Sequence, residues 1–119
     1  MRALRVLGAM GVSLMAVFAL ATPAFATTPA TVYDLVGDYA RWNYDTNVLT
    51  VCDNDPHEGV AKAILSVDGG GTWTKYDDNG AQPGCGIAGP LNVDDSKSAH
   101  LYICPNNWSD CREKLLDHL

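Results

Sequence analysis

The chain has 119 residues, and fourteen acidic side chains against eight basic ones give it a formal net charge of −6. This length fits one domain and excludes a β-propeller, because a propeller needs several blades of roughly 40 residues each. The acidic balance repels polyanions, so DNA, RNA and anionic lipid are poor partners.

The first 26 residues have the organisation of a secretory signal peptide. Arg2 and Arg5 form a positive n-region, an apolar run covers residues 6–20, and Ala24-Phe25-Ala26 fits the small-x-small cleavage pattern. The apolar run is shorter than the roughly 20 residues that span a bilayer, which argues against a membrane anchor. We therefore expect cleavage near Ala26 and release of a monomeric extracellular domain, residues 27–119, with six basic and fourteen acidic side chains.

The first part of the mature chain predicts one hairpin after a loose start. Residues 27–32 are rich in Thr, Pro and Ala and are expected to lack fixed structure. Over residues 39–44, apolar and aromatic side chains alternate with polar ones, which is typical of a half-buried strand. A turn at 45–47 and a run of β-branched residues over 48–53 complete the predicted hairpin.

The remaining elements are also short and β-like. We expect strands over residues 60–67, 72–77, 86–91 and 99–104. After Pro105, Ser109 is positioned to cap a short helical turn, and a last edge strand is the alternative for this tail. About six strands separated by frequent turn signals predict an all-β fold, a single antiparallel β-sandwich or small barrel.

The turn after residue 67 belongs to the segment Ser66-Val67-Asp68-Gly69-Gly70-Gly71-Thr72-Trp73. Asp68 is expected to accept hydrogen bonds from amide groups two residues on, and the glycines are expected to adopt φ > 0. These eight residues resemble the Asp-box, Ser-x-Asp-x-Gly-x-Thr-Trp, best known from sialidase propeller blades and found also in unrelated folds that include some microbial ribonucleases. The resemblance implies a structural hairpin, with a local sugar or ion contact as the alternative.

The cysteines predict two disulfide bonds, because an even number in a short exported chain is typical of a disulfide framework. They are Cys52, Cys85, Cys104 and Cys111. Of the three possible connectivities we favour Cys52–Cys85 with Cys104–Cys111, since the second pair brackets a short turn rich in Pro and Asn. In the chain-entropy model the longer loop contributes roughly 3.5–4 kcal/mol and the shorter roughly 2.5 kcal/mol. A zinc site is disfavoured because no C-x2-C spacing occurs.

A wider resemblance involves Tyr44-Asp45, the run Leu49-Thr50-Val51-Cys52-Asp53 and the later Gly59-Val60-Ala61. With the Gly-rich cysteine segment and the last cysteine-ended strand, these features resemble small secreted two-disulfide proteins of actinobacteria. The resemblance covers most of the mature chain and implies export, a β-rich fold and the favoured cysteine pairing. It implies no catalytic residue.

One acidic loop is a candidate calcium site. Asp53, Asp55 and Glu58 gather carboxylate oxygens, which Ca²⁺ prefers, in a short flexible stretch. The EF-hand pattern fails, because Ile64 occupies the position of its bidentate Glu. Calcium is therefore a hypothesis beside an ordinary solvated turn, and we expect no other cofactor.

The preferred function is non-catalytic binding of an extracellular protein or glycan, since rigid β scaffolds commonly recognise ligands through their loops. Trp108, in a polar turn, is the aromatic residue expected to be exposed, with Tyr39 and Asp77 as further candidate ligand-binding residues. Alternation places Trp42 and Trp73 mostly in the core.

Two alternatives stay open. The first is inhibition of an extracellular hydrolase by a loop such as residues 77–84. The second is a small extracellular hydrolase, in which His57 and Glu58 would act as acid and base. No nucleophile elbow, HExxH helix or phosphate loop occurs, so we assign no catalytic residue and expect no enzyme.

Overall fold

Apolar side chains at alternate positions give most strands of this protein one inward face. The computed structural model describes residues 27–55, 60–78, 83–105 and 110–119, and these residues form strands and no helix. The strands are β1 (Ala30–Tyr33), β2 (Tyr39–Asn43), β3 (Val48–Cys52), β4 (Lys62–Val67), β5 (Thr72–Tyr76), β6 (Gly86–Ala88), β7 (Ala99–Cys104) and β8 (Arg112–Leu116).

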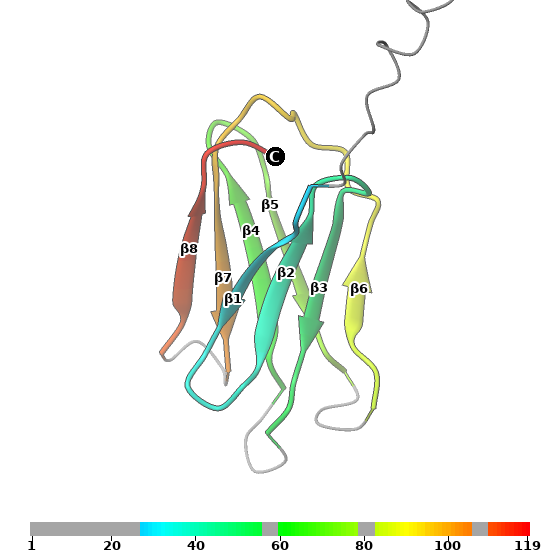
Figure 1. Cartoon of the computed structure of the whole chain (residues 1–119), viewed down its shortest axis with the longest axis vertical. Coiled ribbons are helices and arrows are strands. Elements are labelled where there is room, and N and C mark those ends of the chain that lie inside the picture. The colour runs from blue at the N-terminus through cyan, green and yellow to red at the C-terminus, as the bar shows by residue number, and fades with distance from the viewer. Residues whose placement is uncertain (1–26, 56–59, 79–82, 106–109) are drawn as a thin grey trace, which may run out of the picture.

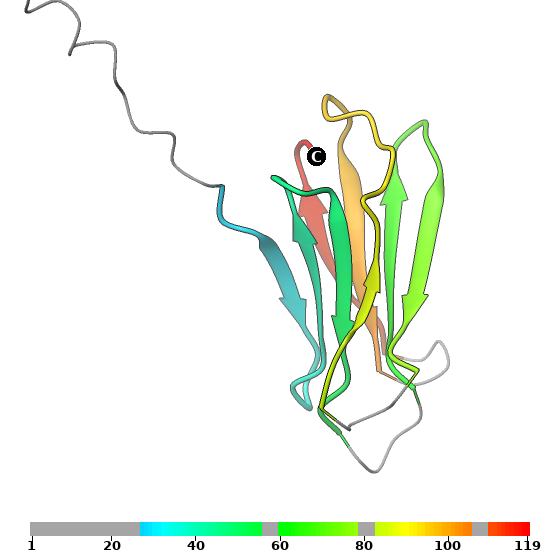
Figure 2. The same cartoon turned by 90° about the vertical axis from the view of Figure 1, so that its right-hand side faces the viewer.

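The strands build two antiparallel sheets that face each other, as Figure 1 and Figure 2 show. The first sheet has the strand order β1–β2–β3–β6, and the second has the order β5–β4–β7–β8. At the edges, β1 lies near β8 and β5 lies near β6. The predicted all-β fold is confirmed, in the form of a sandwich.

The core lies between the two sheets. The first sheet contributes Trp42 and Leu49, and the second contributes Leu65 and Leu101, all completely buried. Trp42 therefore lies in the core as alternation predicts. Trp73 is half-buried and packs against the edge of the core, because it lies on the edge strand β5.

Both disulfides lie at one end of the sandwich. The strands alternate in direction, so β1, β3, β5 and β7 end, and β2, β4, β6 and β8 begin, at the lower end of Figure 1. Cys52–Cys85 joins the end of β3 to the segment before β6, and Cys104–Cys111 joins the end of β7 to the start of β8. The favoured pairing is confirmed.

The start of the mature chain differs from its prediction. Residues 27–32 were expected to be loose, but Ala30–Tyr33 forms β1 and pairs with β2 in the register Ala30↔Trp42. Ala30 and Val32 are buried against the core. This packing outweighs the low strand propensity of Ala30, and Thr31, Val32 and Tyr33 are residue types that favour strands.

The end of the chain also resolves an open alternative. The helical turn expected after Pro105 is wrong, and the edge-strand alternative is correct: β8 pairs with β7 in the register Ala99↔Leu116. Leu116 faces the core while Leu115 faces solvent, the two-residue period of a strand rather than of a helix. Ser109, the expected helix cap, lies outside the described residues.

Candidate functional site

The β1–β2 loop, residues 34–38, is closed by its own first residue. Oδ1 of Asp34 accepts the backbone N–H groups of Val36 and Asp38, each at 2.9 Å. The N–H of Asp34 donates to the carbonyl of Asp38 at 3.0 Å. A short side chain that accepts local amide bonds is a common way to fix a turn, and these three bonds all lie within the loop.

A second set of bonds ties this loop to the end of β3. The N–H of Asn54 donates to Oδ1 of Asp38 at 2.6 Å, and its side-chain Nδ2 donates to the carbonyl of Gly37 at 2.8 Å. Gly37 has a φ of +96°, a conformation that residues with a Cβ rarely adopt. The loop is therefore fixed from within and from the adjacent strand.

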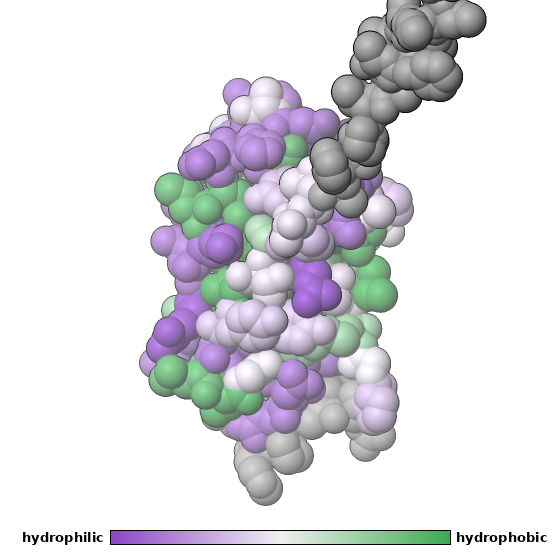
Figure 3. Space-filling model, viewed as in Figure 1, coloured by the Kyte–Doolittle hydropathy of each residue, from purple (hydrophilic) through white to green (hydrophobic). Residues whose placement is uncertain are grey.

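The rigid loop presents apolar side chains to solvent. Leu35 is 83% exposed and Val36 is 43% exposed. At the base of the loop, Tyr33 is 54% exposed, and its ring centroid lies 5.5 Å from that of the half-buried Tyr39. The Arg41 guanidinium lies over the Tyr39 ring, 4.9 Å from its centroid. We call Tyr33, Leu35, Val36 and Tyr39 the β1–β2 tip; Figure 3 shows hydrophobic atoms at its place near the lower end.

A groove borders the β1–β2 tip. It has a volume of about 380 Å³ and runs between the β1–β2 loop and the start of β8. Leu35 and Val36 line it from the first sheet, and Pro105 and Arg112 line it from the second. Apolar contact area beside a few charged groups is the usual composition of a recognition site.

Beneath these loops lie two buried carboxylates. Asp53 accepts the N–H of Asp55 at 3.0 Å and that of Ala61 at 3.2 Å, one on each oxygen. Oδ2 of Asp77 accepts the N–H of Asp53 at 2.9 Å, and Asp77 is only 1% exposed. Asp77 was proposed as a ligand-binding residue, but the structure places it under the surface, where it holds the β3–β4 connection.

The other predicted site residues divide between two cases. Tyr39 belongs to the β1–β2 tip. Trp108, His57 and Glu58 lie outside the described residues. Within the described ranges no group of three or more His, Cys, Asp or Glu side chains is placed to hold a metal ion. Calcium binding at Asp53, Asp55 and Glu58 stays a prediction.

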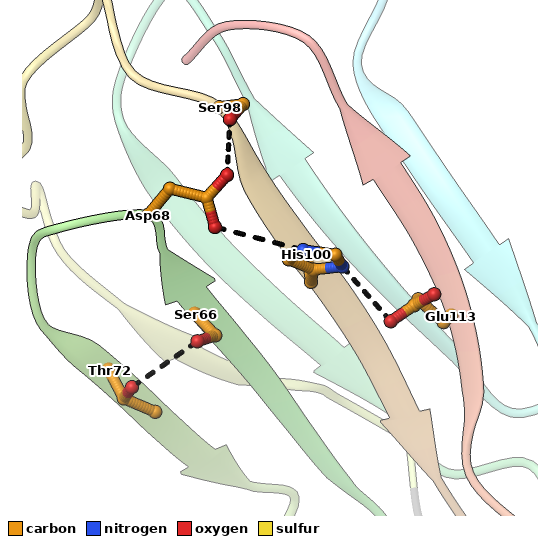
Figure 4. Close-up of polar contacts among 6 residues, drawn as sticks. All are labelled: Ser66, Asp68, Thr72, Ser98, His100 and Glu113. Carbon is orange, nitrogen blue, oxygen red and sulfur yellow. Dashed lines mark hydrogen bonds and ion pairs between the residues drawn. The ribbon is translucent and has the colours of Figure 1, made fainter.

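A second polar cluster lies on the outer face of the second sheet, near its other end (Figure 4). The ring of His100 lies between two carboxylates, with Nδ1 3.0 Å from Oε2 of Glu113 and Nε2 3.7 Å from Oδ1 of Asp68. Tyr102 hydrogen-bonds to Glu113, and this bond is the main cause of the lowered pKa of Glu113. The cluster connects the β4–β5 turn with β7 and β8.

This cluster does not present a nucleophile to the histidine. The hydroxyl of Ser98 donates to Oδ2 of Asp68, and both nitrogens of His100 face carboxylates. Nucleophilic catalysis by serine needs its hydroxyl on the base instead. The arrangement is that of a surface network that fixes a turn.

The Asp-box-like hairpin has a different internal geometry from the one expected. The carboxylate of Asp68 reaches Ser98 and His100 across the sheet, whereas the N–H of Gly70 donates to the carbonyl of Val67 at 3.0 Å. The expected bond from Asp68 to the turn amides is therefore replaced by a contact that follows from the β4–β7 pairing. Of the three glycines expected to adopt positive φ, Gly69 does so, at +69°, and Gly70 and Gly71 do not.

No known protein family, curated protein or solved structure matches this chain. The two disulfides are typical of proteins that fold in oxidising compartments outside the cytosol. The part of the chain that the structure describes contains no helical segment with the length and hydrophobicity that crossing a membrane requires.

The residues of the β1–β2 loop were not among the predicted site residues. Asp34-Leu35-Val36-Gly37-Asp38 matches no functional motif. The available signal was the residue order: two aspartates and a glycine, which are common in turns, surround Leu35 and Val36, which are not.

Proposed function

We propose that the protein is exported, cleaved near Ala26, and acts as a non-catalytic binding module that recognises an extracellular protein or glycan through the β1–β2 tip. The observation that carries this proposal is the 83% exposure of Leu35 on a loop fixed by five hydrogen bonds. A mobile loop could turn a leucine away from water, but this loop keeps it in solvent.

The physical reason for linking rigidity to binding is entropic. Ordering a loop on association opposes binding, so a loop that is already ordered keeps more of its contact energy. Aromatic and aliphatic side chains that enter a partner's pocket supply most of the energy of a typical interface. Tyr33 and Tyr39 add such area at a small loss of side-chain freedom, because tyrosine has few rotatable bonds.

Affinity capture tests the proposal. The mature domain, residues 27–119, is immobilised and exposed to the producing organism's culture fluid, to its cell-wall fraction and to insoluble polysaccharides such as peptidoglycan and chitin. We expect a retained component that the double variant Leu35→Ser/Val36→Ser binds about tenfold more weakly or worse, because truncated anchor residues dominate binding losses.

Leu115→Ser is the matched control, since Leu115 is 58% exposed on β8, away from the β1–β2 tip. It should bind like the wild type, and both variants should keep the wild-type melting temperature. Equal retention by the double variant and the wild type would contradict the proposal.

Inhibition of an extracellular hydrolase is the second candidate. The observation that favours it is again Leu35, because protein inhibitors of proteases present one protruding side chain on a preorganised surface. The mature domain is titrated against secreted serine proteases that cleave after large apolar residues. Inhibition lost in Leu35→Asp would support this candidate, and an unchanged protease activity at all ratios would exclude it for that enzyme class.

A further inference from the structure

Two buried oxygens in the β1–β2 loop lack a hydrogen-bond donor. Oδ2 of Asp34 and Oδ2 of Asp38 are both closed to solvent and accept no hydrogen bond. The Asp38 side chain is completely buried, and its carboxyl group lies in hydrogen-bonding contact with that of Asp34. Two ionised carboxylates would set acceptor against acceptor here, which is unfavourable because each has lost water without gaining a donor.

The other two oxygens of the pair are already satisfied, and unequally. Oδ1 of Asp34 accepts two amide N–H groups, from Val36 and Asp38, each at 2.9 Å. Oδ1 of Asp38 accepts one, from Asn54, at 2.6 Å. Complete burial favours the neutral form of Asp38, which has only this one amide donor to offset it.

Two carboxyl groups in hydrogen-bonding contact, each with one buried oxygen lacking a donor, need a positive charge between them, either a metal ion or a proton. Calcium takes roughly six to eight oxygens, and the described residues bring no group of three ligating side chains together. A proton needs only the two oxygens present. We propose that Asp34 and Asp38 share one proton, carried on Oδ2 of Asp38 and donated to Oδ2 of Asp34.

The surroundings reinforce this assignment. Besides Asp34, the charge of Asp53, which directly follows β3, acts on the carboxyl group of Asp38. On the other side of Asp34, the groove is also lined by the charged residues Asp110 and Arg112. Burial is the main cause that raises the pKa of Asp38 to about 7, and the hydrogen bond and charge of Asp34 and the charge of Asp53 add to it. The amide of Asn54 acts in the opposite direction.

Release of this proton would place a second negative charge inside the closed loop. Repulsion between the two buried carboxylates, and the cost of keeping a second charge away from water, then favour an open loop. The β1–β2 tip is thereby coupled to pH, and its ligand binding, which rests on the proposed function, should weaken above about pH 7.

Carboxyl-carbon NMR of the mature protein, titrated from about pH 4 to pH 9, tests the shared proton without any ligand. We expect the Asp38 carboxyl carbon to change near pH 7, and the Asp34 carboxyl carbon and the Val36 amide to respond with the same midpoint. Midpoints below about pH 5 for both carboxyl groups would overturn the proposal, whether or not the tip binds anything.

Two variants locate the proton. In Asp38→Asn the new amide donates to Oδ2 of Asp34, so the loop should keep its amide shifts and lose the transition near pH 7. In Asp34→Asn the new amide donates to Asp38, whose midpoint should fall by two or more pH units. Asp45→Asn, in the exposed β2–β3 turn, should change neither. A midpoint near pH 7 that persists in both pair variants would place the proton elsewhere.

The same NMR measurement with and without calcium distinguishes a shared proton from a bound metal ion. The carboxyl spectrum at about pH 7.5 should be the same in millimolar CaCl₂ and in chelator. A calcium-dependent shift of the Asp34 and Asp38 carbons would replace the proton by a metal ion and overturn the assignment.

Discussion

Asp77 shows how a single carboxylate stabilises this fold. Its Oδ2 accepts the buried N–H of Asp53 at 2.9 Å, and its own N–H donates to the carbonyl of Ala61 at 3.0 Å. The residue thereby joins the end of β5 to the connection between β3 and β4. Asp34, Asp38 and Asp53 have similar roles, since each also accepts a backbone amide in a loop.

We expect Asp77→Ala to lower the free energy of unfolding by about 2 kcal/mol, because it leaves the Asp53 N–H buried without an acceptor. Asp77→Asn, which keeps an acceptor oxygen, should recover much of the loss. Urea denaturation measures both effects. The exposed neighbour is the control: Asp78→Ala should change stability by no more than about 0.5 kcal/mol, and an equal effect of the two alanine variants would show that Asp77 is not structural.

At the scale of the elements, β6 closes one side of the sandwich by a close backbone approach. A Cβ placed on Gly86 would lie 2.3 Å from the carbonyl oxygen of Tyr76 and 3.0 Å from Cγ1 of Val51. β6 can therefore pair with β3 and pass the end of β5 only if this position has no side chain.

Gly86→Ala should destabilise the protein by about 3 kcal/mol, at the upper end of what overpacking a well-packed site costs. Thermal unfolding followed by circular dichroism measures it. Ile87→Ala, on the same strand with an exposed side chain, should cost less than about 1 kcal/mol. A wild-type melting temperature for Gly86→Ala would mean that β6 does not lie against Tyr76 as described.

The sequence predicts the central strands better than the edge strands, for a physical reason. β2, β3, β4 and β7 have partners on both sides, and their alternating patterns follow directly from one buried face. β1 and β8 have a partner on one side only. β8 also begins with three charged residues, so its strand structure depends on pairing with β7 and on the Cys104–Cys111 bond. Alternation also places Lys62 on the polar face, yet it is buried, and burial lowers its pKa.

The candidate site was less predictable than the fold. Tyr39 was identified as a candidate ligand-binding residue from its residue type. Nothing in the sequence distinguishes Leu35 and Val36 from residues of an ordinary loop. Their exposure depends on the bonds that Asn54, sixteen residues after Asp38, makes to the loop. Such long-range contacts have no local signal, and the same reason explains why Asp77 was expected at the surface.

For the molecule as a whole, the Asp38 carboxyl group predicts how stability depends on pH. Its pKa is about 7 in the folded chain against 3.8 for an ordinary aspartate, so between these values the folded state holds a proton that the unfolded state has released. Stability should therefore fall as pH rises through this window. Asp94 and Glu113, whose pKa values are lowered, act in the opposite sense, and their stabilisation is lost on acidification below about pH 4.

Thermal melts should give a melting temperature that declines by several degrees between about pH 5 and pH 8, and Asp38→Asn should flatten this decline. Histidine is the other residue type that changes charge in this range, so His100→Gln serves as the control and should keep most of the slope. If the decline disappeared in His100→Gln and persisted in Asp38→Asn, the pH dependence would come from His100, and the prediction for Asp38 would be wrong.

A disulfide-linked sandwich holds the β1–β2 loop rigid while its apolar side chains face solvent. Hydrogen exchange of the Val36 and Asp38 amides, measured by NMR at about pH 6, tests this most directly. Because both amides donate to Asp34, we predict exchange about 100-fold or more slower than in an unstructured peptide. Exchange at the unstructured rate would instead show that the loop is mobile and that its exposed leucine has no fixed position to offer a partner.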